Sequence, residues 1–185
     1  TRVPLGNEPP VPGTGKLAPA ADPHERASYA RFLGTDYAPD RILARALAFV
    51  RDNQDRPFFL YFPSTLPHLA LHVPDAETKA YAFAEQPYLG DRGYTPHATP
   101  RAAYAAMITH LDSDVGALVD LLAALQLAAD TIVVFTSDNG ATHSPVGGTD
   151  VDFFASCGEL RGRKGSLHEG GIRVPAIVRW PGHVP

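Results

Sequence analysis

Residues 131–140 read TIVVFTSDNG, an apolar run that ends in a polar turn. The run 131–136 is short, continuous and rich in β-branched residues, which favours a strand buried on both faces. Ser137, Asp138, Asn139 and Gly140 follow it directly. The stretch therefore predicts a strand whose carboxyl end carries polar side chains.

The strongest predicted helix lies upstream of this run. Thr99 can cap it and Pro100 suits its first turn. Its apolar stripe consists of Tyr104, Met107, Ile108, Leu111, Val115, Leu118, Val119 and Leu122. The same spacing predicts another helix from Pro39 to near Asn53.

Two further apolar runs, FFLYF at 58–62 and AIVRW at 176–180, are predicted as strands. Strand, long helix and strand form a βαβ unit, which implies a parallel sheet with helices packed on it. Ligands bind beyond the carboxyl ends of such strands. If the first two strands are parallel, His68, Asp138 and the long loop that contains Lys164 share one edge of the sheet.

The length and composition indicate one globular domain. The chain has 185 residues, 44% hydrophobic and 19% charged, with a formal net charge of -4. It contains no block of Lys and Arg that could follow a phosphate backbone, so nucleic acid is not an expected partner. No apolar run approaches the roughly 18 residues of a membrane-spanning helix. Residues 1–35 are predicted to be a Pro/Gly-rich extended segment.

Asp138 and Asn139 are the first candidate site. A hard cation such as Ca²⁺ or Mg²⁺ needs oxygen ligands, and adjacent Asp and Asn offer a carboxylate and an amide oxygen. Gly140 lets the chain turn away. The alternative is an ordinary turn, because Asp-Asn-Gly is a strong turn sequence.

Cations and histidines form the other candidates. His68, on a loop stiffened by Pro67, can donate a proton or bind an anionic oxygen, and the alternative is a structural loop histidine. His72 could be a supporting or surface residue. Lys164 lies in a segment where small residues alternate with cations, which lets the lysine approach a tetrahedral oxyanion, although a solvated basic loop is the alternative. Cys157 is interpreted as structural.

In order and spacing, these pieces resemble the type I sulfatases of the alkaline phosphatase superfamily. The resemblance covers residues 36–185 and includes PFFLY at 57–61, FTSDNG at 135–140, and LRGRK at 160–164 with EGGIRVP at 169–175. It implies a three-layer α/β/α fold with a parallel sheet, of which this chain is a central part.

The resemblance also implies roles. Asp138 and Asn139 would bind the divalent cation, usually calcium, with Mg²⁺ as the alternative. His68 would contact the sulfate and leaving oxygen, and Lys164 would bind the sulfate. His143 is a further candidate for contact with the leaving group. The substrate would be a sulfate ester of a small molecule or a carbohydrate.

The nucleophile of this family is a formylglycine made from a Cys/Ser-x-Pro/Ala-x-Arg signature. The sequence from Cys157 to Arg161 has Glu159 at the central position and follows the metal pair instead of preceding it, so it is not this signature. The 185-residue chain alone is therefore expected to be inactive and to bind metal weakly. Many bacterial members of the family are exported, but the sequence leaves the compartment of the parent, periplasmic or secreted, undetermined.

Two other functions fit parts of the pattern. A phosphoesterase or phosphonate hydrolase of the same superfamily uses similar metal ligands, but its nucleophile is an unmodified Thr or Ser. A non-catalytic module could bind sulfated glycans through Lys164, Arg163 and His68. Such a module would bind without metal and would keep its affinity after Asp138→Ala.

Overall fold

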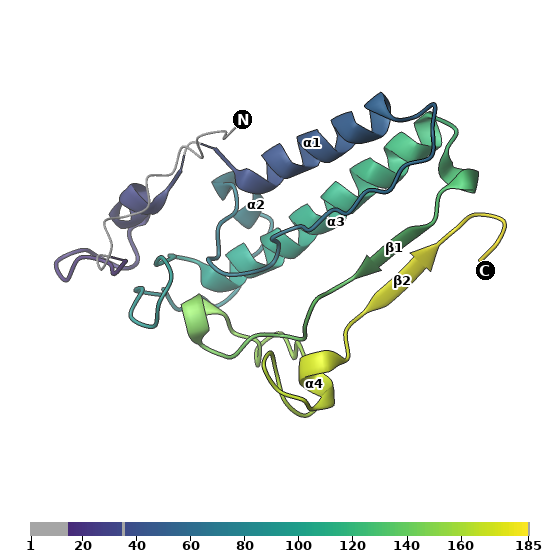
Figure 1. Cartoon of the computed structure of the whole chain (residues 1–185). Coiled ribbons are helices and arrows are strands. Elements are labelled where there is room, and N and C mark those ends of the chain that lie inside the picture. The colour runs from purple at the N-terminus through teal and green to yellow at the C-terminus, as the bar shows by residue number, and fades with distance from the viewer. Residues whose placement is uncertain (1–14, 35, 185) are drawn as a thin grey trace. The chain divides into compact units, whose positions relative to one another are not determined.

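The computed structural model describes residues 15–34 and 36–184, so residues 1–14 and 35 of the predicted extended segment lie outside it. Two long helices and one pair of short strands are its main elements (Figure 1). The elements in chain order are η1 (Arg26–Phe32), α1 (Ala38–Asp52), α2 (Asp75–Thr78), α3 (Pro100–Ala124), η2 (Ala128–Asp130), β1 (Val133–Thr136), η3 (Val146–Gly148), α4 (Glu169–Ile172) and β2 (Ala176–Arg179).

Both long helices form where the spacing of apolar residues predicts them. The model places α1 at Ala38–Asp52 and α3 at Pro100–Ala124. The cap of α3 differs from the prediction, because the carboxylate of Glu85 accepts hydrogen bonds from the amides of Arg101 and Ala102, at 3.0 and 2.7 Å. A negative carboxylate at the amino end of α3 is also attracted to the positive pole of the helix dipole, which stabilises the helix. A residue 16 positions away in the chain therefore caps the helix.

The chain divides into two compact units. The first unit comprises residues 15–34, 36–41, 65–111 and 144–150 of the described chain. Its core consists of apolar side chains that pack against one another. The buried members of this core cluster are Leu66, Leu71, Val73, Ala103, Ala106 and Met107.

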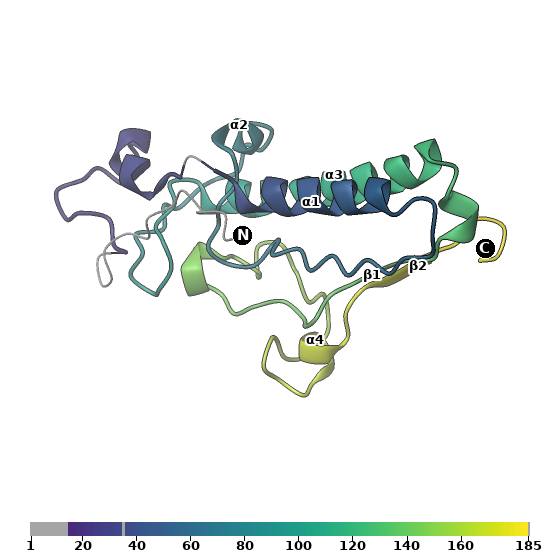
Figure 2. The same cartoon turned by 45° about the horizontal axis from the view of Figure 1, so that its top comes forward.

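The second unit comprises residues 42–64, 112–143 and 151–184 of the described chain. Its sheet consists of β1 and β2, which lie side by side in Figures 1 and 2. The strands are antiparallel, with Val133 opposite Arg179 and Thr136 opposite Ala176. Trp180, directly after β2, donates from its indole nitrogen to the carbonyl oxygen of Ala129 at 2.7 Å and so ties the far end of β2 to η2.

Two expectations about the strands are wrong for this chain. Residues 58–62 are extended but are not assigned as a strand, because no described neighbour pairs with their backbone. The predicted pairing of parallel strands is also absent from the described residues, whose one sheet is the antiparallel pair β1–β2.

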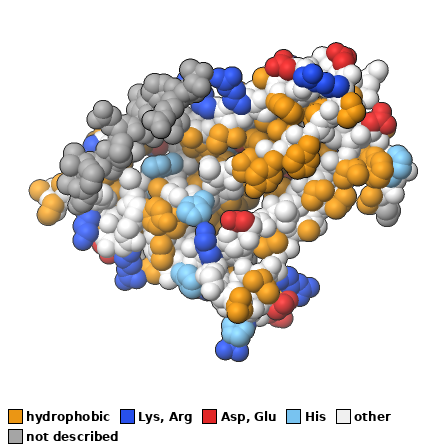
Figure 3. All heavy atoms as spheres, in the orientation of Figure 1, with side chains coloured by type: hydrophobic (Ala, Val, Ile, Leu, Met, Phe, Trp, Pro, Cys, Tyr) orange, Lys and Arg blue, Asp and Glu red, His pale blue; other side chains and the backbone are white. Residues whose placement is uncertain are grey.

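The apolar runs are not buried on both faces either. Phe59 is 86% exposed, Val134 61% and Ile177 60%. Figure 3 shows hydrophobic side chains at the surface in the region of β1 and β2. A continuous apolar run predicts a strand that can be covered on both faces, but only packing partners achieve that burial. The described residues leave both faces of β2 open, since Ile177 and the adjacent Val178 point to opposite faces and both are exposed.

Among the described residues, none of the helices has both the length and the apolar character needed to cross a membrane.

Candidate functional site

The polar residues after β1 lie where the sequence predicts them. β1 ends at Thr136, and Ser137 then donates a hydrogen bond from its hydroxyl to the carbonyl oxygen of Asn139 at 3.0 Å. The side chain of Asp138 is exposed and that of Asn139 is half-buried. The strand end thus presents a carboxylate and an amide close together on a turn that an internal hydrogen bond holds.

These two residues fit part of a site for a hard divalent cation. They supply only oxygen donors, the atoms that Ca²⁺ and Mg²⁺ prefer, and Ca²⁺ takes six to eight of them. Within residues 15–34 and 36–184, no group of three or more His, Cys, Asp or Glu side chains is arranged to hold a metal. Asp138 and Asn139 could therefore supply two ligands of a larger shell.

The loop that contains Lys164 is tied directly to the chain that follows this pair. The amide of Lys164 donates to the carbonyl oxygen of Ala141 at 2.8 Å. The Nε2 atom of His143 lies 3.0 Å from the carbonyl oxygen of Lys164, and a carbonyl only accepts, so Nε2 carries the hydrogen. The structure thus brings Asp138, Asn139 and His143 onto a segment that is hydrogen-bonded to the predicted sulfate-binding lysine.

Four glycines make this arrangement possible, and we call them the glycine junction: Gly140, Gly162, Gly170 and Gly171. A Cβ on Gly140 would lie 2.0 Å from the carbonyl oxygen of Gly170, and one on Gly170 would lie 2.1 Å from that of Gly162. Real Cβ atoms essentially never approach so closely. Only glycine lets these backbones touch.

Backbone hydrogen bonds hold the glycine junction together. The amide of Gly140 donates to the carbonyl oxygen of Gly171 at 3.0 Å, and that of Gly170 donates to the carbonyl oxygen of Arg161 at 2.8 Å. Gly170 and Gly171 are buried within the short helix α4. The junction therefore connects the segment after β1, the loop before Lys164 and α4 without using side chains.

His68 belongs to the first unit, whereas the other candidates belong to the second. Its side chain is exposed, and its Nδ1 lies 2.7 Å from the carbonyl oxygen of Leu69. Nδ1 must donate there, so the neutral ring leaves Nε2 as an acceptor. The predicted juxtaposition of His68 with Asp138 and Lys164 stays a prediction.

His72 is held by hydrogen bonds within the first unit. Its Nε2 lies 2.7 Å from the hydroxyl oxygen of Thr95, and burial lowers the pKa of its ring below the ordinary value of 6.5. The carbonyl oxygen of His72 accepts a hydrogen bond from the hydroxyl of Tyr37 at 2.9 Å. These contacts favour a supporting role within the first unit over a role at the surface.

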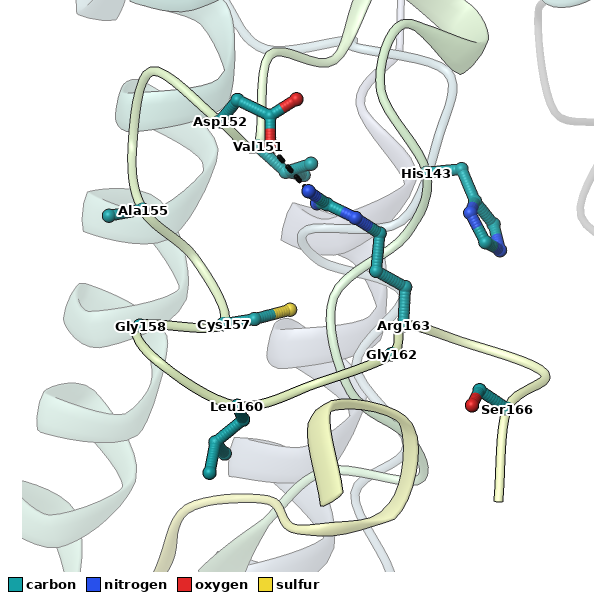
Figure 4. A pocket seen from close by; sticks show the side chains of 10 residues that line it. All are labelled: His143, Val151, Asp152, Ala155, Cys157, Gly158, Leu160, Gly162, Arg163 and Ser166. Carbon is teal, nitrogen blue, oxygen red and sulfur yellow. Dashed lines mark hydrogen bonds and ion pairs between the residues drawn. The ribbon is translucent and has the colours of Figure 1, made fainter. Parts of the chain in front are cut away.

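Sequence reasoning did not single out Asp152 and Ser166, which line a cavity in the second unit together with His143, Cys157 and Arg163 (Figure 4). Asp152 forms an ion pair with Arg163. No sequence signal marks this pair, because it joins residues 11 positions apart in an irregular loop.

Comparison with known proteins places these motifs in a family. The sulfatase family model matches residues 10–185. Mouse steryl-sulfatase is 36% identical over 149 residues, which are 80% of this chain and 21% of that protein. Human arylsulfatase A is 32% identical over 147 residues, or 76% of this chain and 24% of that protein.

A solved structure, that of Ps i-CgsB in complex with k-i-k-neocarrahexaose, is similar with a TM-score of 0.63 and 32% identity. The similarity covers 82% of this chain and 30% of that one. The present chain thus spans about a fifth to a quarter of the length of the curated relatives described above. Because the family model covers nearly the whole chain, the protein belongs to the sulfatase family, whose fold is of the alkaline phosphatase-like α/β type.

Proposed function

We propose that this chain supplies one side of a sulfatase active site that hydrolyses sulfate esters. The observation that carries the proposal is the hydrogen bond from the amide of Lys164 to the carbonyl oxygen of Ala141. This bond couples the predicted sulfate-binding lysine to the chain that follows Asp138 and Asn139. The formylglycine nucleophile is supplied by polypeptide outside this chain, since the 185 residues contain no Cys/Ser-x-Pro/Ala-x-Arg signature.

Each residue has a role in the proposed reaction. Negative charge grows on the bridging oxygen as the S–O bond breaks, and the ammonium of Lys164 neutralises part of it. Protonated His68 donates a hydrogen bond or a proton from Nε2 to the leaving oxygen, since Nδ1 already donates to the carbonyl oxygen of Leu69. His143 binds the leaving group. Asp138 and Asn139 hold a divalent cation, for which calcium is the first choice and Mg²⁺ the second; when bound, it supplies charge stabilisation.

Carbohydrate sulfates are the proposed substrate class. A similar solved structure contains neocarrahexaose, which supports this class, whereas the names of two curated relatives, an arylsulfatase and a steryl-sulfatase, do not. The loop between His143 and Lys164 carries a cavity with polar side chains, which suits a sugar better than a flat apolar ring.

The first test is calcium binding by the 185-residue chain. Addition of CaCl₂ in NMR titrations should shift the amide signals of Asp138 and Asn139, with a dissociation constant of about 1 mM or weaker, because only part of the shell is present. Asp138→Asn should abolish the shifts. Asp130→Asn is the matched control, since Asp130 is an exposed aspartate before the other end of β1.

Two outcomes would overturn these assignments. Absence of any shift at Asp138 and Asn139 would refute the metal site, and calorimetry that shows tight calcium binding would refute the partial shell. Turnover of a chromogenic aryl sulfate by the chain alone, above a Lys164→Ala control, would show that the nucleophile is not supplied from outside. Metal-independent binding of sulfated glycans that survives Asp138→Ala would instead favour a non-catalytic binding module.

A further inference from the structure

A cavity of about 600 Å³ lies in the second unit, in the loop that leads to Lys164. This volume is in the range of small-molecule sites. Val151 and Leu160 supply apolar walls, and Asp152, Arg163 and Ser166 supply polar groups. In Figure 4 the side chains of Asp152 and Arg163 meet across one side of the cavity.

The guanidinium of Arg163 is only partly satisfied. Its Nη2 donates to Oδ1 of Asp152. Its Nη1 is buried and has no hydrogen-bond partner among the described residues. A buried donor without an acceptor is unfavourable and uncommon in native proteins, so an oxygen atom from a ligand or a bound water is expected beside Nη1.

The charges within the cavity define the kind of ligand. Asp152 and Arg163 neutralise each other, so the cavity does not select a net anion. The carboxylate of Asp152, which is 69% exposed, can still accept hydrogen bonds, while Arg163 can donate from Nη1. The hydroxyl oxygen of Ser166 accepts from the amide of His168 at 3.1 Å, and its hydrogen can be donated to a ligand. Adjacent acceptors and donors above apolar walls match a ring with neighbouring hydroxyl groups.

The cavity adjoins the proposed active site in the chain itself. Arg163 directly precedes Lys164, and His143 lines the cavity while its Nε2 donates to the carbonyl oxygen of Lys164. A ligand in the cavity therefore lies against the same loop that presents the predicted sulfate-binding lysine.

We propose that this cavity is a sugar subsite, in which Asp152, Arg163 and Ser166 bind the hydroxyl groups of an uncharged pyranose ring. Val151 and Leu160 pack against the carbon–hydrogen face of that ring. The role as a substrate subsite rests on the proposed sulfatase function, whereas binding of an uncharged sugar does not. The subsite selects carbohydrate sulfates over aryl sulfates by holding a ring of the leaving group.

Titration of the ¹⁵N-labelled 185-residue chain with uncharged sugars tests the subsite. The probes are the methyl glycosides of galactose, glucose, mannose and fucose, and glycerol serves as the control for unspecific polyol effects. At least one glycoside should shift the amide signals of Asp152, Arg163 and Ser166. Asp152→Asn and Arg163→Lys should each weaken that binding at least about tenfold. The first replaces a charged acceptor by a neutral amide, and the second removes the planar guanidinium with its Nη1 donor.

Controls separate the subsite from the proposed active site and from misfolding. Asp130→Asn, an exposed change in the same unit, should leave sugar binding unchanged, and dispersed spectra of every variant verify folding. Asp138→Asn should also leave it unchanged while it abolishes the calcium response. Sugar binding without a calcium response would contradict the proposed metal site and leave the subsite intact.

The proposal is overturned if none of the four glycosides shifts these signals, in which case the oxygen beside Arg163 is water. It is also overturned if the shifts persist unchanged in both Asp152→Asn and Arg163→Lys.

Discussion

The core of the first unit and the glycine junction of the second hold the chain in different ways. Around Leu71 and Met107, each 1% exposed, apolar side chains from distant segments fill the interior. In the glycine junction the backbone of Gly170 lies against that of Gly140 and Gly162, with no room for a Cβ. One region excludes water with side chains, and the other achieves close approach by lacking them.

This difference indicates that the core controls the stability of the chain and that the glycine junction controls the geometry of the site. Burial of apolar side chains is the dominant favourable contribution to folding. Backbone hydrogen bonds contribute less net free energy each but fix direction and distance. We therefore expect substitutions in the core to change global stability most, and substitutions in the junction to displace Lys164 relative to Asp138.

The largest expected effect is that of Leu71→Ala. Removal of a fully buried leucine side chain should lower the free energy of unfolding by about 2–5 kcal/mol, since transfer energy is lost and a cavity remains. Chemical denaturation followed by circular dichroism measures the change. Leu167→Ala is the matched control, because Leu167 is 92% exposed and should change stability by less than about 0.5 kcal/mol. Equal effects of the two would contradict the proposed distribution of stability.

The next effect is that of Gly170→Ala. Its new Cβ would lie 2.1 Å from the carbonyl oxygen of Gly162, so the backbone must move. We expect destabilisation of about 1–3 kcal/mol, as for other overpacked sites. Faster hydrogen exchange at the amides of Gly140 and Lys164 should accompany it, and weaker calcium shifts at Asp138 should follow.

Gly116→Ala provides the control for the glycine junction. Gly116 lies inside α3, and a Cβ there would meet nothing within 4 Å. This change should stabilise the helix by about 0.5–1 kcal/mol, because alanine loses less conformational freedom than glycine on folding. If Gly170→Ala behaved like Gly116→Ala, the junction would not control the geometry of the site.

The last prediction concerns the loss of stability of the first unit in acid. Burial lowers the pKa of His97 to about 4, and the nearby His72 contributes in the same direction. Asp75 opposes this shift and Arg26 supports it. The unfolded chain then binds a proton near pH 6.5 and the folded chain near pH 4, so stability falls as the pH decreases through that window.

Denaturation at pH 7.5 and 5.5 measures this effect. The contribution of His97 to the loss should be about 1 kcal/mol over that interval. His97→Gln should reduce the pH dependence by this amount, although it can lower stability at both pH values. An unchanged pH dependence in the variant would show that His97 is not held neutral by burial.

Much of the secondary structure could be predicted from local patterns. Helical spacing of apolar residues predicted α1 and α3 to within a few residues, and β-branched runs predicted β1 and β2. The buried face of α3 was predicted less well. Met107 is buried, but Ile108 is 43% exposed, and the small residues Ala103 and Ala106 form part of the core instead. Burial depends on which neighbour packs against the helix, and local spacing does not contain that information.

The candidate site likewise has one part that sequence order predicts and another that only the folded structure shows. The polar turn after β1 follows from the order of residues along the chain, and its position at a strand end is confirmed. The ion pair of Asp152 with Arg163 and the contact of Gly170 with Gly140 could not be predicted. Two adjacent glycines, Gly170 and Gly171, are compatible with a close approach of two backbones. The sequence does not show which other segment of the chain approaches them.

The sequence by itself determined the family, the two long helices and the residues proposed to bind metal and sulfate, because these depend on residue type, order and spacing. Only the tertiary structure decided that β1 and β2 pair antiparallel, that Glu85 caps α3, and that backbone bonds connect Lys164 to the chain after Asp138. These features join residues far apart in the chain. They arise from packing and from hydrogen bonds that exist only once the chain has folded.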